Sequence, residues 1–202
     1  LLPLIDAMKK EGWTVTSVCS DGPNIAELRA KGYIIEPICI ARNFNVLRHF
    51  KTIICLTRYF KDNQFDIVHV HTPVAALIAR IAARLASVPL VIYTAHGFYF
   101  HDEMSPIKRW FFILLERWVG RFTDILFTQS QEDALSAEKE RLAPNGVVHA
   151  IGNGVDPEKF DPKSAAEPSV TLKSLKIPEN SFVIGVVARL VQEKGICEFI
   201  DA

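Results

Sequence analysis

The sequence predicts an α/β protein built on a doubly wound parallel sheet, and two features carry this prediction. Short runs of β-branched and apolar residues alternate along the chain with longer segments whose apolar residues recur every three to four positions. Such alternation is typical of βαβ units, whose parallel strands are covered by the crossover helices. The length agrees, because 202 residues with 49% hydrophobic content suffice for one α/β domain and part of a second.

The predicted elements follow one another in a regular order. The chain begins in a helix, because Leu1, Ile5 and Met8 share one helical face and Gly12 stands where a helix would end. Runs rich in β-branched and apolar residues then predict strands at 14–19, 33–40, 66–71, 90–95, 124–130, 147–151 and 182–189. The segments between these strands show helical periodicity and predict helices at 24–31, 46–61, 74–86 (rich in Ala), 106–121 and 131–142.

A change in composition marks the domain organisation. Residues 156–169 are rich in Pro, Lys, Glu and Ala, as linkers between domains commonly are. We therefore expect a first domain at residues 1–155, a linker at 156–180 and the beginning of a second domain at 181–202.

Charge and cysteine usage exclude several classes of protein. The net charge of zero gives no argument for nucleic-acid binding, and apolar runs such as 110–115 are too short to span a bilayer. No basic region precedes an apolar run at the start of the chain, so we expect a cytoplasmic protein without a signal peptide. The four cysteines are scattered, and we expect them to be reduced, buried and inert: Cys19, Cys39, Cys55 and Cys197.

The last predicted strand leads into a segment suited to a diphosphate. Arg189 ends the strand, and Lys194 and Gly195 precede a helical pattern. Ligands of open α/β sheets bind beyond the carboxyl ends of the strands, and paired phosphates need directed positive donors. Taken alone, a surface Arg and Lys flanking a turn would explain the segment better.

Three further motifs precede this segment in a fixed order. They are Asp66-Ile-Val-His-Val-His-Thr72, Tyr93-Thr-Ala-His96-Gly97 and Ile151-Gly-Asn-Gly154-Val-Asp156. With these four motifs the chain resembles the retaining glycosyltransferases of family 4 over nearly its whole length. The resemblance implies the GT-B fold, in which two Rossmann-like domains face a cleft, and a chain truncated at both ends.

The resemblance also implies that a strand precedes the first helix and lies at the centre of the sheet. Without that strand, its two neighbours would leave backbone groups unpaired, which is costly in a buried environment. Either the protein is longer, or the two halves of the sheet close up.

The resemblance assigns roles to the residues of the cleft. It implies that Arg189 and Lys194, with Gly195 beside them, bind the donor diphosphate and neutralise it as the leaving group. It places His96 opposite the donor sugar as a catalytic residue, with Gly97 allowing close backbone approach. The alternative for His96 is that it only caps the end of its strand.

The other histidines have several interpretations. His69 and His71 share one face of a strand, so a metal pair is conceivable, but no third ligand follows at a suitable spacing and no metal is expected. We expect His71 and Thr72 at the edge of the cleft and His69 as a hydrogen-bonded core residue. His101 lies in a loop that could approach the acceptor.

The Gly152–Asp156 segment is not a dinucleotide fingerprint, because Pro157 stands where a third glycine would be required. No Walker loop is present either, since Lys194 precedes its glycine. Asn153-Gly154 is a turn signal. By resemblance these two residues form the crossing between the domains, where Asp156 would fix the linker.

Cations and aromatic residues interleave in residues 108–121, and residues 42–61 are also basic. Such a segment suits a helix at an anionic membrane surface, which needs apolar area to insert and positive charge toward the headgroups. The alternative is an ordinary amphipathic helix whose aromatic residues pack on the sheet. Aromatic and cationic stacking could also serve nucleic acid, but nothing else in the sequence supports it.

The resemblance thus implies a glycosyltransferase that moves a sugar from a nucleoside diphosphate sugar to a glycan or polyprenyl-linked acceptor with retention, in bacterial polysaccharide or envelope synthesis. No cofactor or metal is expected. The expected location is the cytoplasm, and peripheral attachment to the inner face of the membrane stays open. The chain alone should be inactive, since part of the donor site lies beyond it. Two alternatives stay open: a nucleotide-sugar epimerase or hydrolase of the same fold, and a non-catalytic acceptor-binding or membrane-binding module.

Overall fold

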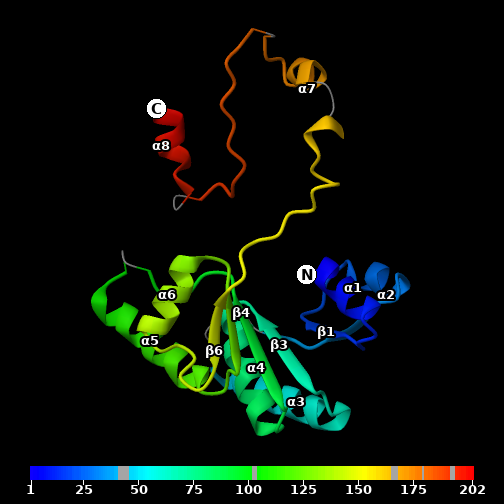
Figure 1. The fold of residues 1–202 in the computed structure, drawn as a ribbon, viewed down its shortest axis with the longest axis vertical. Helices are drawn as coiled ribbons and strands as arrows, with labels where there is room; N and C mark the ends of the chain where they lie inside the picture. The colour runs from blue at the N-terminus through cyan, green and yellow to red at the C-terminus, as the bar shows by residue number, and fades with distance from the viewer. Residues whose placement is uncertain (41–45, 102–103, 165–167, 179, 192–193) are drawn as a thin grey trace. The chain divides into compact units, whose positions relative to one another are not determined.

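The structure, a computed structural model, describes residues 1–40, 46–101, 104–164, 168–178, 180–191 and 194–202 (Figure 1). The chain divides into two compact units, Leu1–Asn153 and Gly154–Ala202. The predicted assignment of two domains joined by a linker at 156–180 stays a prediction.

The first unit contains a four-stranded parallel sheet in the order β3-β4-β5-β6. Its strands are β3 (Ile67–His71), β4 (Leu90–Ala95), β5 (Ile125–Thr128) and β6 (Val147–Ala150). Helices α4 (Pro73–Leu85), α5 (Pro106–Gly120) and α6 (Gln131–Lys139) connect successive strands. The predicted alternation of strand and helix is therefore confirmed for this part of the chain, with differences of a few residues at the element ends.

The start of the chain forms a separate two-stranded parallel sheet. Strands β1 (Thr16–Cys19) and β2 (Ile34–Pro37) pair with each other, and the accompanying helices are α1 (Leu2–Lys10), α2 (Ile25–Ala30) and α3 (Val46–Asn63). Among the described residues no ladder joins this sheet to β3. The alternative in which the two halves of the sheet close up is therefore wrong. The split falls where the resemblance places a central strand.

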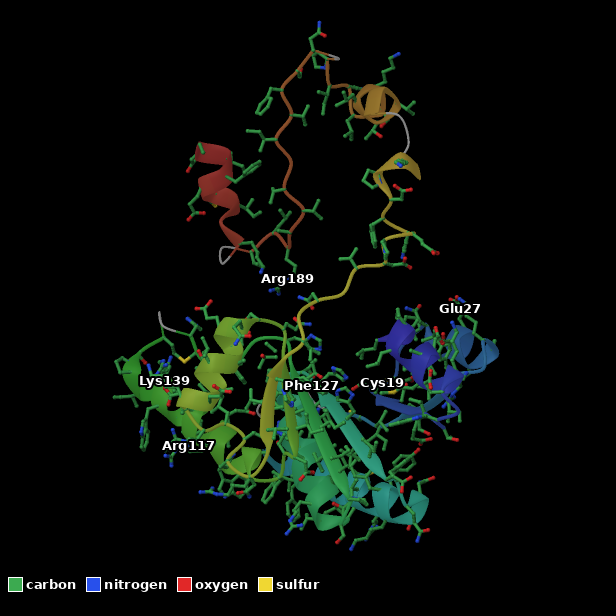
Figure 2. All side chains as sticks on the ribbon, in the orientation of Figure 1. Cys19, Glu27, Arg117, Phe127, Lys139 and Arg189 are labelled. Atoms are coloured by element: carbon green, nitrogen blue, oxygen red, sulfur yellow. The ribbon has the colours of Figure 1, made fainter. Side chains whose placement is uncertain are left out.

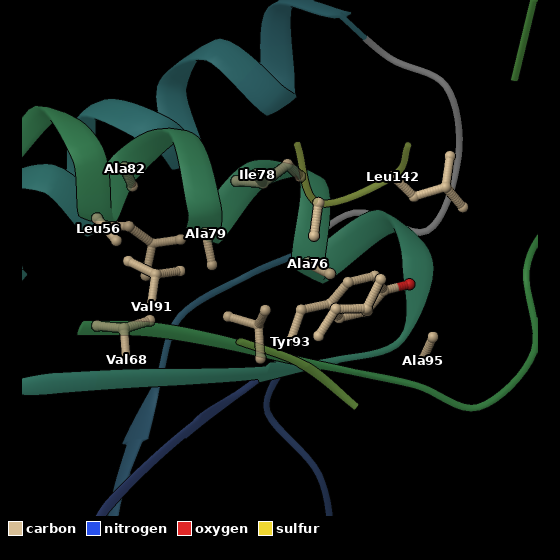
Figure 3. Packing of buried hydrophobic residues seen from close by; sticks show 14 of the residues in the cluster. Leu56, Val68, Ala76, Ile78, Ala79, Ala82, Val91, Tyr93, Ala95 and Leu142 are labelled. Carbon is tan, nitrogen blue, oxygen red and sulfur yellow. The ribbon is translucent and has the colours of Figure 1, made fainter. Parts of the chain in front are cut away.

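The core lies between α4, α3 and the faces of β3 and β4. Figure 3 shows Val91 and Tyr93 of β4 facing Ala76 and Ala79 of α4. Alanines let α4 approach the sheet closely, and Leu56 of α3 fills the remaining space with 1% of its surface exposed. The Ala-rich sequence of α4 thus serves packing as well as helix formation.

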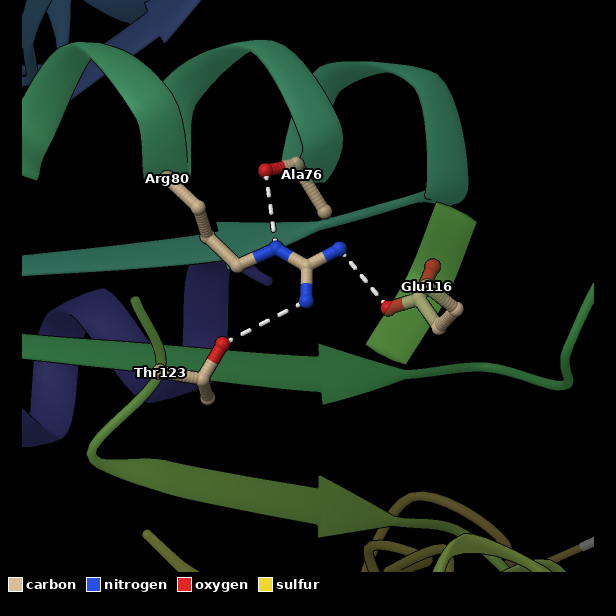
Figure 4. Close-up of polar contacts among 4 residues, drawn as sticks. All are labelled: Ala76, Arg80, Glu116 and Thr123. Carbon is tan, nitrogen blue, oxygen red and sulfur yellow. Dashed lines mark hydrogen bonds and ion pairs between the residues drawn. The ribbon is translucent and has the colours of Figure 1, made fainter. Parts of the chain in front are cut away.

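A fully buried arginine connects the elements of this core (Figure 4). The Nε of Arg80 donates to the carbonyl of Ala76 (3.0 Å), Nη2 donates to Glu116 on α5 (2.7 Å), and Nη1 donates to Thr123 before β5 (3.3 Å). The guanidinium also lies 4.4 Å from the ring centroid of Tyr93 on β4. A buried charge is tolerated only when it is paired and hydrogen-bonded, and Arg80 meets both conditions.

The prediction of a strand at residues 182–189 is wrong. These residues form no strand, and Phe182 and Val187 are almost completely exposed. The described part of the second unit contains only a 3₁₀ turn at Pro162–Ser164, α7 (Pro168–Ser174) and α8 (Ile196–Asp201), so this apolar run has no neighbouring strand to pair with.

The cysteines are free thiols, but all four are exposed rather than buried. Cys19 and Cys39 lie at and just beyond the carboxyl ends of β1 and β2, where side chains emerge from the small sheet. Spacing along the sequence carries no information on this exposure.

Loss of the buried guanidinium should destabilise the protein strongly. Arg80→Ala leaves Glu116 without its ion pair in a largely buried position, and breaking such a pair costs about 3–5 kcal/mol. Chemical denaturation followed by circular dichroism measures the free energy of unfolding. Arg84→Ala is the control, because Arg84 lies exposed on the same helix and its loss should cost less than about 0.5 kcal/mol. Equal costs for the two variants would contradict the structural role of Arg80.

Candidate functional site

Three polar side chains meet at the carboxyl edge of the four-stranded sheet. His71 is the last residue of β3, His96 follows β4 directly, and Gln129 follows β5 directly. Parallel pairing places His71 opposite Thr94, and Ala95 opposite Thr128. Residues that follow these positions therefore emerge together at one edge, which is where open α/β sheets bind ligands.

Hydrogen bonds and ring contacts connect the side chains at this edge. Nδ1 of His71 lies 3.1 Å from Nε2 of His96, and Nδ1 of His96 lies 2.6 Å from Nε2 of Gln129. Nε2 of His69 lies 2.8 Å from Oγ1 of Thr94, one layer deeper in the sheet. The rings of His69 and His71 have centroids 4.4 Å apart, and those of His71 and His96 stack at 5.3 Å. We call His69, His71, His96 and Gln129 the histidine edge.

Two of the imidazoles at the histidine edge, those of His69 and His71, are neutral at physiological pH. Burial, followed by the nearby His69 and His96, lowers the pKa of His71 to about 4. Burial, followed by His96, also lowers the pKa of His69. Both side chains are half-buried, so the charged imidazolium would lose solvation and face other cations. Neutral imidazoles offer one N–H donor and one acceptor each, which suits recognition of hydroxyl groups.

The backbone at this edge adopts conformations that are uncommon for most residues. Gly97 has φ of 109°, and a Cβ built there would meet no atom within 4 Å. The space beside Gly97 is therefore open to a ligand. Thr72 has φ of 64°, which is strained for a β-branched residue, and it precedes Pro73 at the start of α4. Such strain is common at binding sites, and here it lies beside His71.

The predicted site residues fall into separate parts of the structure. His71, Thr72, His96 and Gly97 are brought together at the histidine edge. His101 is exposed in the loop that leads to α5, and its side chain forms no hydrogen bond or ring contact with another described residue. His69 is the hydrogen-bonded residue that the sequence predicts.

The remaining predicted residues belong to the second unit or to its border. The division between the units falls between Asn153 and Gly154. Oδ1 of Asp156 accepts hydrogen bonds from the backbone N–H groups of Glu158 and Lys159, so this carboxylate closes a local turn. In the second unit Lys194 is exposed, and Gly195 takes a left-handed φ of 63° before α8. Arg189 lies at the end of the extended 182–189 segment. The donor roles of Arg189, Lys194 and Gly195 stay predictions.

Sequence reasoning missed Gln129 and Thr94. Thr94 is hidden inside an apolar strand, and only the cross-strand register brings it to His69. For Gln129 a signal exists, because any polar residue directly after a strand of a parallel sheet reaches the same edge as His71 and His96. Within the described ranges no group of three or more His, Cys, Asp or Glu residues could hold a metal ion.

Helix α5 carries a second candidate surface, on which cationic and aromatic side chains lie together. A cavity of about 330 Å3 opens between α5 and Glu140 and is lined by Met104, Pro106, Arg109, Trp110, Ile113, Leu114, Arg117 and Glu140. Figure 2 shows Arg117 on α5 and Lys139 on the neighbouring α6. Trp110, Phe111 and Trp118 are 63%, 56% and 49% exposed. The alternative in which these three aromatic residues pack together on the sheet is therefore wrong.

Comparison with known proteins agrees with this architecture. The sequence model of Glycosyltransferase Family 4 matches residues 1–159. The UDP-Gal:alpha-D-GlcNAc-diphosphoundecaprenol alpha-1,3-galactosyltransferase of Escherichia coli is 29% identical over 200 residues, covering 98% of this chain and 51% of that protein. The capsular polysaccharide biosynthesis glycosyltransferase CapM of Staphylococcus aureus is 28% identical over 209 residues, covering 98% and 52%. The chain thus spans about half the length of the curated relatives it matches.

A solved structure supports the fold. The crystal structure of a glycosyltransferase from Rickettsia africae superimposes with a TM-score of 0.71 at 17% identity, over 96% of this chain and 49% of that chain. The predicted fold class, an α/β protein of the GT-B type with a Rossmann-like parallel sheet, is confirmed.

The lowered pKa of His71 predicts a specific dependence of stability on pH. The unfolded chain takes up a proton near the ordinary value of 6.5, whereas folded His71 takes it up only near 4. Stability is therefore fully present above pH 6.5 and falls as the pH drops from about 6.5 toward 4. In His71→Gln this part of the decline should disappear. The measurement is the free energy of unfolding between pH 7.5 and 4. His149→Gln, which removes an exposed histidine of the same sheet, should keep the wild-type decline. A decline unchanged in His71→Gln would contradict the burial of a neutral His71.

Proposed function

The chain belongs to glycosyltransferase family 4, and on that premise we propose that the whole protein transfers a sugar, with retention, from a nucleoside diphosphate sugar to a glycan or lipid-linked acceptor in bacterial polysaccharide synthesis. The histidine edge carries this proposal: the imidazoles of His71 and His96 lie beside an open glycine, where an α/β sheet binds its ligand. The family match over residues 1–159 and the transferases among the relatives support a transfer reaction over an epimerase or a non-catalytic module.

In this proposal the first domain recognises the sugar of the donor and the acceptor molecule. His96 faces the donor sugar, and Gly97 lets the ligand approach the backbone. His71 and Thr72 form the adjoining wall, and His101 lies in the loop toward the acceptor. Neutral side chains fit this role, because sugar hydroxyls need donors and acceptors of hydrogen bonds rather than charge.

The second domain handles the leaving group. Retaining transfer develops positive charge on the sugar as the diphosphate departs, so the enzyme must neutralise the departing anion. Arg189 offers a planar fork and Lys194 a compact charge, and the two together suit a diphosphate without a bound metal. Asn153, Gly154 and Asp156 form the crossing from one domain to the other.

Removal of one cation should slow transfer far more than it alters folding. Arg189→Ala or Lys194→Ala removes a charge-assisted hydrogen bond that strengthens as the leaving group gains charge. Such a loss costs about 3 kcal/mol of barrier, or roughly a hundredfold in rate. His96→Ala should lower turnover more than nucleotide affinity, since it contacts the sugar. The measurements are nucleotide affinity and transfer rate of the whole protein.

Two controls make this experiment decisive. Arg84→Ala removes an exposed cation of the first unit and should leave transfer unchanged. A reaction without acceptor tests the epimerase and hydrolase alternatives, which would form product in its absence. Unchanged transfer in both cation variants would refute the leaving-group assignment, and unchanged transfer in His96→Ala would leave this histidine as a strand cap.

We further propose that α5 holds the protein on an anionic membrane surface. Its exposed apolar residues recur at helical spacing and form one stripe: Ile107, Trp110, Phe111, Leu114 and Trp118. Lys108 and Arg121 flank this stripe with exposed positive charge. Apolar area bordered by cations is what an interfacial helix requires. None of the helices in the described ranges is both long and apolar enough to cross a bilayer.

Binding to vesicles should depend on both charge and apolar area. Each cation near an anionic surface contributes about 1 kcal/mol, so the double variant Lys108→Gln/Arg121→Gln should bind roughly thirtyfold more weakly. Co-sedimentation with vesicles of anionic and of neutral lipid, at low and high salt, measures this. Arg84→Gln is the matched control on another exposed helix face. Equal binding of wild type to anionic and neutral vesicles would refute the electrostatic part, and undiminished binding of Trp110→Ser/Trp118→Ser would refute insertion of the stripe.

A further inference from the structure

The histidine edge contains a continuous chain of hydrogen bonds that runs across three strands. Gln129 contacts His96 at 2.6 Å, and His96 contacts His71 at 3.1 Å. All three residues stand at the carboxyl ends of neighbouring strands, so the sheet itself sets their spacing. The order and register of the strands therefore bring these three side chains together, although His96 itself is exposed.

The direction of this chain follows from the donors available. In this structure the amide nitrogen of Gln129 faces His96 and is a donor only, so with this amide orientation Nδ1 of His96 accepts and carries no proton. A neutral imidazole with a bare Nδ1 holds its proton on Nε2, and that proton is donated to Nδ1 of His71. Nδ1 of His71 is then the acceptor, and its proton also lies on Nε2.

We infer that Gln129 is a positioning residue that fixes both His96 and His71 as Nε2–H tautomers and so leaves the Nε2–H of His71 as the ring donor offered at this edge. Nε2 of His71 has no hydrogen-bond partner among the described residues. The group that it would recognise is an uncharged or anionic oxygen, such as a sugar hydroxyl. The role in sugar transfer rests on the proposed function, whereas the order of tautomers does not.

The chemistry of Gln129 distinguishes this arrangement from an ordinary carboxylate–histidine pair. A carboxylate only accepts, so it would require a proton on Nδ1 of His96 and would favour the imidazolium. The amide is neutral and donates, which keeps both rings neutral. With both ring nitrogens of His96 engaged, His96 cannot accept a proton from a ligand unless one of these two hydrogen bonds breaks. The histidine edge is thus arranged to donate a hydrogen bond rather than to act as a base.

Nuclear magnetic resonance of the ring nitrogens tests this inference without any substrate. Long-range ¹⁵N–¹H spectra of the protein distinguish a protonated from an unprotonated ring nitrogen. The signals of each ring are assigned by their loss in His71→Asn and His96→Asn. In the wild type, Nδ1 should be the unprotonated nitrogen in both rings. A proton on Nδ1 of either ring would overturn the inference, including the case in which the amide of Gln129 is turned the other way.

Two variants test the part played by Gln129. Gln129→Glu should place a proton on Nδ1 of His96. Gln129→Leu should remove the preference of His96 for the Nε2–H tautomer and give a mixture of the two tautomers. Gln131→Glu is the matched control, because it makes the same chemical change two residues later, at an exposed position at the start of α6. Ring spectra that remain those of the wild type in Gln129→Glu and Gln129→Leu would overturn the positioning role. If either variant fails to fold, the wild-type spectrum still decides the order of tautomers.

Activity of the whole protein provides a separate readout. Gln129→Glu should lower the turnover number by at least tenfold while nucleotide affinity changes less than twofold. The reason is that the histidine rings whose tautomers change face the sugar and not the nucleotide. Wild-type turnover in Gln129→Glu, together with an altered ring spectrum, would overturn the role in transfer and leave the tautomer order standing. Absence of any transfer activity in the wild type would instead refute the proposed function.

Discussion

The buried ion pair between Arg80 and Glu116 is the interaction on which the arrangement of the first unit depends. Arg80 lies in the middle of α4, which begins directly after His71 and Thr72, and Glu116 lies on α5, which follows the loop from His96. The same guanidinium contacts Tyr93 of β4 and Thr123 before β5. One side chain therefore connects α4 and α5 with β4 and with the segment before β5, and the carboxyl ends of these two strands lead to His96 and Gln129. A buried pair of this kind contributes little net stability over an apolar alternative, but it specifies one arrangement of its neighbours.

The chemistry of the site follows from the sheet that this core holds in place. Parallel register brings His71, His96 and Gln129 to one edge, and burial together with the neighbouring histidines lowers the pKa of His71 to about 4. With the tautomers that we infer, the rings form a directed chain of hydrogen bonds. In the proposed function, the groups of this edge serve the sugar, and Arg189 and Lys194 serve the diphosphate.

Much of the fold could be predicted from the sequence, because helical and strand periodicities report on local structure and packing at the same time. Strand β4 and the starts of α3 and α5 lie where the pattern places them. Residues 182–189 show the limit, since an apolar β-branched run forms a strand only when a neighbouring strand is present. Thr94 and the ion pair of Arg80 could not be predicted from the sequence, because each depends on which residues the register and the helix packing bring together. Gln129 could have been predicted, since it is a polar residue directly after a strand of a parallel sheet. The exposed stripe on α5 was also only partly predictable. The sequence shows that the helix combines cations and aromatic residues, but which face points to solvent depends on the burial of Ile113 and Val119 in the core.

The central claim is that neutral histidines at the carboxyl edge of the sheet contact the sugar of the donor. Ring spectra of His71 and His96 in the whole protein, recorded with a nucleoside diphosphate sugar and with the corresponding nucleoside diphosphate at saturating concentrations, test it most directly. We expect the ring signals to shift with the nucleotide sugar and to stay nearly unchanged with the nucleoside diphosphate. Saturation with a nucleotide sugar whose binding is established by calorimetry, without any shift of either ring, would contradict the account.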